Sequence, residues 1–213
     1  MHIQLPASID GSRREVVTAL IADLALVAGV RAVVVGGSHA RGTAVPSSDV
    51  DLGLYYVDAA PFAIEQIRYI ANRWSAPHST VVTNFYEWGP WVNGGAWLRT
   101  TSGRVDLLFR SIDDVKRTLA EAVAGTCHRH YDQQPAHGFY SVIYLAEIAD
   151  CWIVTDPHSA ISRLRHRAGA VRLKGHRAFG TSGKPGAAAF GVGYFDAPAV
   201  GGDCRARRRF LRA

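Results

Sequence analysis

The strongest indication of the fold comes from two nearby segments, Gly36-Gly37-Ser38-His39-Ala40-Arg41-Gly42 and Ser48-Asp49-Val50-Asp51-Leu52-Gly53-Leu54. The β-branched run Ala32–Val35 precedes the first segment and predicts a buried strand that turns at the glycines into a short helix. At such a turn glycine lets an anion approach the backbone N–H groups at the positive end of a helix. The hydroxyl of Ser38 adds a further donor. Gly37 and Ser38 are therefore candidate phosphate-binding residues.

Carboxylates follow on the next predicted strand, over residues 50–57. Because side chains alternate along a strand, Asp49 and Asp51 share one face, while Leu52 and its apolar neighbours face the core. Adjacent carboxylates repel each other unless a cation lies between them, and Mg²⁺, with Mn²⁺ as a substitute, is the hard divalent ion that suits oxygen ligands. A later strand adds Asp106, an acid among apolar residues that needs a charged partner. Phosphate-binding residues beside carboxylates indicate metal-assisted phosphoryl or nucleotidyl transfer.

The remaining pattern predicts an α+β fold with a mixed sheet flanked by helices. The expected order is α, β, short α, β, α, β, β, β, α, α, with some strands paired as hairpins. We expect helices over residues 13–28, 39–44, 61–74, 111–124 and 137–152, and strands over 32–35, 50–57, 80–83, 97–100 and 104–109. Ser111 is the expected N-cap of the fourth helix, and Asp156-Pro157 opens another short one.

Composition narrows the class of protein. The 213 residues are 48 % hydrophobic and 20 % charged, which excludes a wholly disordered, collagen-like or coiled-coil chain. The three cysteines are widely spaced and form no disulfide framework, so we expect a reducing cytoplasm. We expect no membrane association, because no apolar segment is long enough to span a bilayer and the N-terminus lacks the pattern of a signal peptide.

Positive charge is confined to the C-terminal part. Residues 1–162 carry 12 Lys and Arg against 16 Asp and Glu, a net charge of −4, whereas residues 163–213 carry 12 against 2, a net charge of +10. No helix or strand period persists beyond residue 163, so we expect a poorly ordered basic tail. Two hypotheses stay open: a frameshifted or degenerate C-terminus, since GC-rich DNA read out of frame yields such Gly-, Ala- and Arg-rich sequence, or an authentic tail through which nucleic acid binds.

The ungapped pattern GS-x-ARG-x(5)-SD-x-DL, from Gly37 to Leu52, followed by Asp106 on a later strand, resembles the DNA polymerase β-like nucleotidyltransferase superfamily. The minimal and the aminoglycoside nucleotidyltransferases are the most similar members, and the resemblance covers roughly residues 13–125. It implies a nucleotidyltransferase catalytic domain over residues 1–125 and a partial helical C-terminal region over 126–162. The tail then comprises residues 163–213.

The resemblance also implies a phosphate-binding role for the glycine corner. Gly37 and Ser38 would hold the β- and γ-phosphates of an NTP co-substrate, with ATP as the first expectation. Arg41 either adds a charge-assisted phosphate contact or pairs with one of the acids.

The acids take the metal-binding and catalytic roles that the resemblance implies. The implied mechanism uses two metal ions. Asp49 and Asp51 would bind both of them, and Asp106 would bind the catalytic ion and help to deprotonate an acceptor hydroxyl. That hydroxyl would attack the α-phosphorus and release pyrophosphate. The acceptor, a small molecule or a protein side chain, is unidentified, and we expect nucleic acid to contact only the basic tail.

Other interpretations remain open from the residues alone. The chain could be a catalytically inactive nucleotide-binding or antitoxin-like partner protein, or an RNA-binding module that works through its tail. Glu147 is either an exposed helix acid or a general base, at a position that related antibiotic-modifying enzymes use. Trp88, Trp91 and Trp97 either pack at the rim of the core or stack on a bound base or acceptor.

Overall fold

A computed structural model describes residues 3–89, 92–126, 128–130, 139–141 and 143–178 of the chain. The helices are α1 (Gly11–Ala25), α2 (Gly37–Arg41), α3 (Ile64–Trp74), α4 (Ile112–Val123), α5 (Ile143–Asp150) and α6 (Ala160–Ala178). The strands are β1 (Ala32–Val35), β2 (Val50–Tyr56), β3 (Val81–Val82), β4 (Gly95–Thr100), β5 (Gly103–Ser111), β6 (Arg129–His130), β7 (Phe139–Tyr140) and β8 (Trp152–Thr155).

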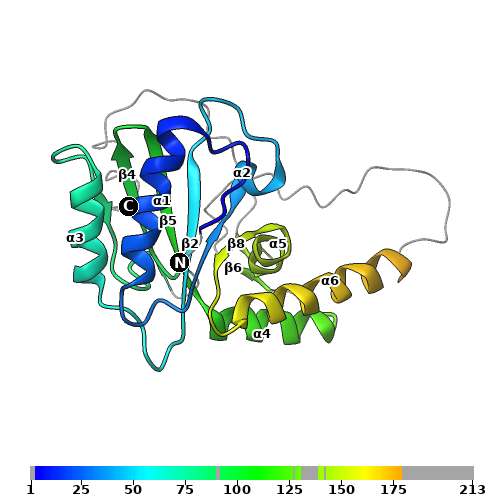
Figure 1. Ribbon diagram of the computed structural model, residues 1–213. Coiled ribbons are helices and arrows are strands. Elements are labelled where there is room, and N and C mark those ends of the chain that lie inside the picture. Colours follow the sequence, from blue (N-terminus) through cyan, green and yellow to red (C-terminus); the bar gives the residue numbers. More distant parts are fainter. Residues whose placement is uncertain (1–2, 90–91, 127, 131–138, 142, 179–213) are drawn as a thin grey trace. The chain divides into compact units, whose positions relative to one another are not determined.

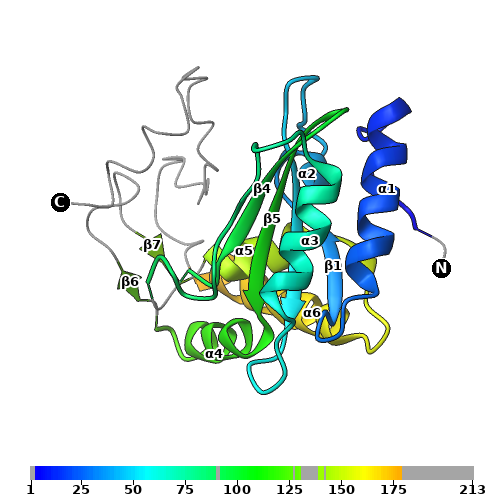
Figure 2. The same cartoon turned by 90° about the vertical axis from the view of Figure 1, so that its left-hand side faces the viewer.

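Six strands form one mixed sheet in the order β3-β4-β5-β2-β1-β8, and β6 and β7 form a separate pair. Within the large sheet β2 and β5 run parallel, and the other neighbours run antiparallel. Helices α1 and α3 cover one face of this sheet, and α5 lies on the other (Figures 1 and 2). The predicted α+β fold with a mixed sheet is therefore confirmed.

Strand alternation divides the buried residues into two cores. Val33 and Val35 of β1 belong to the core beneath α1 and α3, whereas Ala32 and Val34 belong to the core beneath α4, α5 and α6. Val50, Leu52 and Leu54 of β2 lie in the first core, as predicted from their spacing. The alternate β2 residues, which include Asp51, thus face the side of the sheet on which α5 lies.

Two expected helix boundaries near the glycine corner differ from the structure. Helix α2 covers residues 37–41 rather than 39–44, because Gly42 adopts a left-handed conformation with φ 72° and ends it.

The N-cap prediction for α4 is confirmed, since the Ser111 side chain accepts a hydrogen bond from the backbone N–H of Asp114 at 3.1 Å.

The expected helix over residues 137–152 is wrong at its C-terminal end. Helix α5 stops at Asp150, and Trp152 begins β8, which pairs with the otherwise free edge of β1. A side-chain hydrogen bond reinforces this pairing, because the Val33 backbone N–H donates to Oγ1 of Thr155 at 3.0 Å. Tertiary pairing with an open sheet edge here overrides the local helical pattern. Residues 137 and 138 lie outside the described residues.

The expected loss of regular structure from residue 163 is wrong for residues 163–178, which continue α6. Asp156 opens this helix as predicted, since its Oδ1 accepts from the Ala160 N–H at 2.8 Å. Ile161, Leu164 and Ala168 are buried in the core beneath α4 and α5, so packing holds the helix despite its polar composition. The boundary predicted after residue 162 therefore falls inside α6, and residues 179–213 lie outside the described part of the chain.

Candidate functional site

The glycine corner is built around the carboxylate of Asp51. The N–H of Gly36 donates to the Asp51 carbonyl oxygen at 2.9 Å, which joins the end of β1 to β2. Gly37 has φ +60°, and a Cβ at this position would lie 1.9 Å from Oδ2 of Asp51. Any other residue would therefore be strained and would displace this carboxylate, so the local requirement is for glycine.

Asp106 lies beside Asp51 because β2 and β5 are parallel neighbours. Their register pairs Asp51 directly with Asp106, and adjacent strands lie about 4.8 Å apart. Val105 and Leu107 flank Asp106 and are buried in the core beneath α1 and α3. The two acids thus share the opposite face of the sheet, as the sequence predicted for the separate strands.

Asp49 is paired with an arginine in the structure. Its Oδ1 accepts from Nε and Nη2 of Arg104, each at 2.7 Å. The part of the chain with described placement holds no group of three or more His, Cys, Asp or Glu side chains arranged for a metal ion. The structure therefore brings Asp51 and Asp106 together, whereas Asp49 forms an ion pair with Arg104 at the edge of the same face.

The electrostatic environment of Asp51 disfavours its ionised form. Burial, followed by the charges of Asp49 and Glu147, raises the pKa of Asp51 from 3.8 to about 6. Arg110 and Arg41 oppose this rise, so the charge of Arg41 reaches the Asp51 carboxylate from α2. Paired, partly buried carboxylates with an elevated pKa are a donor set that a divalent cation suits, since its charge relieves both burial and repulsion.

A buried ion pair that the sequence did not predict closes the α5 side of the site. Arg110 binds Glu147 in a bidentate manner, with Nε to Oε2 at 2.5 Å and Nη2 to Oε1 at 2.7 Å. Both side chains are only 12 % exposed, so Glu147 is not the exposed helix acid that was one of its two interpretations. The Arg110 guanidinium also lies 5.4 Å from the centre of the Tyr144 ring.

The sequence-based prediction did not include Arg104 and Arg110, although their spacing along β5 indicates which face of the sheet they occupy. Arg104 and Arg110 share the parity of Asp106 along β5, whereas the alternating residues between them are buried in the apolar core: Val105, Leu107 and Phe109. Period-two alternation places all three charges on one face. Their partners, Asp49 and Glu147, come from other elements, so the pairs themselves could not be found from spacing within β5.

Arg13 of α1 positions the loop that leads into Asp49. Its guanidinium donates to the carbonyl oxygens of Pro46 at 3.1 Å, Ser48 at 3.2 Å and Ser102 at 3.1 Å. These bonds tie the turn before β2 to the β4–β5 hairpin. Arg13 thus supports the site from the outer side without contacting the acids in the described hydrogen-bond network.

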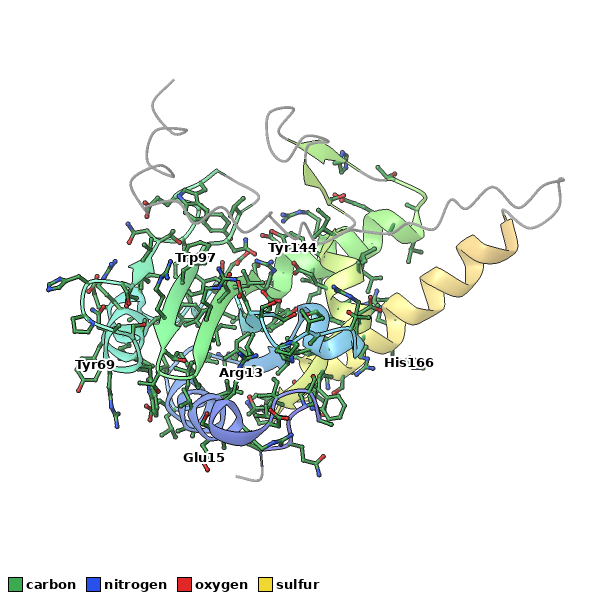
Figure 3. All side chains as sticks on the ribbon, turned by 90° about the horizontal axis from the view of Figure 1, so that it is seen from above. Arg13, Glu15, Tyr69, Trp97, Tyr144 and His166 are labelled. Carbon is green, nitrogen blue, oxygen red and sulfur yellow. The ribbon has the colours of Figure 1, made fainter. Side chains whose placement is uncertain are left out.

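Aromatic side chains flank the acids on the β4 side. Trp97 is the register partner of Asp106, and its ring lies 4.8 Å from that of Trp88, tilted by 30°. Figure 3 shows Trp97 and Tyr144 on one side of the strands, with Arg13 and Glu15 of α1 on the other. Trp88 remains 37 % exposed, so this aromatic pair presents surface to solvent beside the carboxylate face.

Comparison with known families identifies the segment that carries this geometry. Residues 17–90 match the family model described as a nucleotidyltransferase domain. The chain contains a nucleotidyltransferase domain. The match includes the glycine corner and Asp49 and Asp51, and confirms the resemblance to the DNA polymerase β-like superfamily. Asp106 lies beyond the matched segment.

A comparison with curated proteins found no match for the chain. No described helix of the chain is both long and apolar enough to cross a membrane.

Proposed function

We propose that the chain is an enzyme that transfers a nucleoside monophosphate from an NTP, ATP first, to a hydroxyl group with release of pyrophosphate. The observation that carries the proposal is the direct pairing of Asp51 with Asp106, beside a glycine whose missing Cβ leaves room for the Asp51 carboxylate. The nucleotidyltransferase domain match over residues 17–90 supports the same reaction class.

A divalent cation, Mg²⁺ or Mn²⁺, is part of the proposal. Asp51, Asp106 and Asp49 would hold it, with Asp49 released from Arg104 for this purpose. Bound there, the cation would neutralise charge on the triphosphate and on the departing pyrophosphate. The elevated pKa of Asp51, about 6, supports this assignment, because a cation bound there would offset the burial and the carboxylate repulsion that raise this pKa.

The protein side chains then orient and deprotonate the reactants. Gly37 and Ser38 would bind the β- and γ-phosphates, and Arg41 would add positive charge to that end of the triphosphate. Asp106 would accept the proton of the acceptor hydroxyl as its oxygen bonds to the α-phosphorus. The bond from the α-phosphorus to the bridging oxygen breaks, and pyrophosphate leaves with that oxygen. The acceptor would be a small molecule or a protein side chain.

The decisive experiment separates catalysis from nucleotide binding. Each α-labelled NTP is incubated with the full chain, Mg²⁺ or Mn²⁺ and pools of hydroxyl acceptors, and label transfer and pyrophosphate are measured. Thermal stabilisation by NTP with the metal gives a second readout that needs no acceptor. We expect Asp106→Asn to abolish transfer and Asp10→Asn, a change in an exposed acid without a capping hydrogen bond, to preserve it.

The outcomes distinguish the alternatives. Metal-dependent NTP binding without transfer to any acceptor would favour a catalytically inactive nucleotide-binding or antitoxin-like partner protein. Absence of NTP binding with either metal would refute both the enzyme and the nucleotide-binding alternative.

A further inference from the structure

A pocket lies at the end of the sheet opposite the acids. Its volume is about 350 Å³, and its apolar lining includes Val57, which follows β2, and Ile112, which follows β5. Asp51 lies at the start of β2, so six residues at about 3.3 Å each separate the two regions by about 20 Å. In Figures 1 and 2, α2 lies toward the upper end of the strands, and α4 and the start of α6 lie at the lower end.

The polar side chains in the described lining of this pocket are four cations and one histidine. The cations are Arg31, which precedes β1, Lys116 of α4, and Arg163 and Arg167 of α6, and His158 lies in the turn before α6. No Asp or Glu is among the described lining residues. Lys116 is partly neutralised by Asp113 at 3.1 Å, but within the described ranges no acid lies within ion-pair distance of the three arginines. Like charges gathered around one hollow repel each other, and an anion bound there would relieve that repulsion.

The side chain of Arg31 gives a second indication that this pocket binds an anion. Its Nε is buried and has no hydrogen-bond partner among the described residues. Its backbone is held at the start of β1, where its N–H donates to the Tyr55 carbonyl oxygen at 2.7 Å. Leaving a donor of a charged group buried and unsatisfied is costly. An anion beside this guanidinium would offset that cost through its charge.

Helix α6 presents its two lining arginines together. Arg163 and Arg167 are four residues apart and therefore neighbours on one face of the helix. Leu164 both lines the pocket and is buried in the core beneath α4 and α5, so packing holds this turn of the helix in place. The whole helix contains six Lys and Arg and no Asp or Glu.

We propose that this cationic pocket binds a phosphate-bearing anion, with Arg31, Arg163 and Arg167 contacting phosphate oxygens. Three guanidinium groups around one hollow suit a multiply charged phosphate better than a single carboxylate, because each offers a planar fork of donors to phosphate oxygens. The anion could be a phosphorylated small molecule or the phosphodiester backbone of a nucleic acid. The pocket shares no residue with the acid site, so the inference does not rest on the proposed function.

The test observes the pocket directly in the full chain through the imidazole proton signals of His158, assigned with His158→Gln. Inorganic pyrophosphate and an oligouridylate without terminal phosphates are titrated separately, without divalent cations. We expect a saturable shift of the His158 signals. The pair Arg163→Gln and Arg167→Gln should weaken binding about tenfold or more. Lys116→Gln, which removes a lining charge from α4, should weaken it in the same direction.

Arg165→Gln is the control, because it removes one positive charge, as Lys116→Gln does, but at an exposed position of α6 outside the pocket lining. Tighter binding of oligouridylate than of pyrophosphate would identify a nucleic-acid backbone as the source of the phosphate, and the reverse order would identify a small molecule. The proposal is overturned if neither probe shifts His158 at millimolar concentration, or if Arg165→Gln weakens binding as much as the pocket variants.

Discussion

Replacing Asp51 by asparagine should stabilise the protein while it abolishes nucleotidyl transfer. The native protein holds this carboxyl at a pKa of about 6, against 3.8 when it is not buried. At 1.36 kcal/mol for each unit of pKa, ionised Asp51 lowers the free energy of unfolding by at most about 3 kcal/mol. Asparagine has nearly the same shape and cannot ionise, so it removes this penalty.

The pH dependence fixes the sign of the effect. Because the native state keeps the Asp51 proton to higher pH than the unfolded state, unfolding releases a proton between pH 3.8 and about 6. The wild-type free energy of unfolding therefore falls, relative to the variant, as pH rises through this window, and the difference is constant above it. We expect Asp51→Asn to be more stable by about 3 kcal/mol at pH 8 and by only about 1 kcal/mol at pH 4.5.

Denaturant unfolding of both proteins at the two pH values measures this difference. Asp113→Asn is the control of opposite sign, because hydrogen bonds from the Asp58 N–H and from Lys116 lower the pKa of Asp113 in the native protein. The reasoning is refuted if Asp51→Asn has a lower free energy of unfolding than the wild type at pH 8. It is also refuted if the variant is more stable by the same amount at pH 8 and at pH 4.5. Mg²⁺ at ten times its dissociation constant should add about 1.4 kcal/mol to the wild type and nothing to Asp51→Asn.

Two further substitutions test the corner and the buried ion pair. Gly37→Ala and Gly42→Ala should each cost about 1–2 kcal/mol of backbone strain, because both glycines have a positive φ. Gly37→Ala should also abolish transfer, because its Cβ would displace the Asp51 carboxylate. Gly42→Ala should preserve activity, because nothing lies within 4 Å of a Cβ at that position. Equal loss of activity in both variants would contradict this account. Glu147→Gln should lower the free energy of unfolding by about 3–5 kcal/mol, because it leaves Arg110 buried without its carboxylate. The exposed pair of Glu65 with Arg68 provides the comparison, and Glu65→Gln should change stability by less than about 0.5 kcal/mol.

Much of the candidate site could be predicted because its signals are local. The corner at Gly37 needs only neighbouring residues to be recognised, and period-two alternation suffices to put Asp51 opposite Leu52. The same rule places Asp106 on one face of its own strand. These features are properties of backbone geometry over a few residues, so they do not depend on what packs against them.

Pairings between distant segments could not be obtained in this way. Asp49 pairs with Arg104, 55 residues away, and Arg110 pairs with Glu147, 37 residues away. Helix α6 illustrates the same limit. Its polar sequence predicts no regular structure, yet burial of Leu164 and its apolar neighbours against α4 and α5 holds it. Such contacts depend on the whole arrangement of elements rather than on spacing.

The sequence alone determined the glycine corner, the parity of the acids along their strands and the concentration of positive charge near the C-terminus. The parallel pairing of β2 with β5, in the register that sets Asp51 beside Asp106, follows from the three-dimensional arrangement of the strands and not from local sequence. The tertiary structure likewise gathered Arg31 and the α6 arginines, more than 130 residues apart, around one pocket. The reason is physical: alternation and turn chemistry act over a few residues, whereas strand register and helix docking follow from burying both faces of one sheet at once.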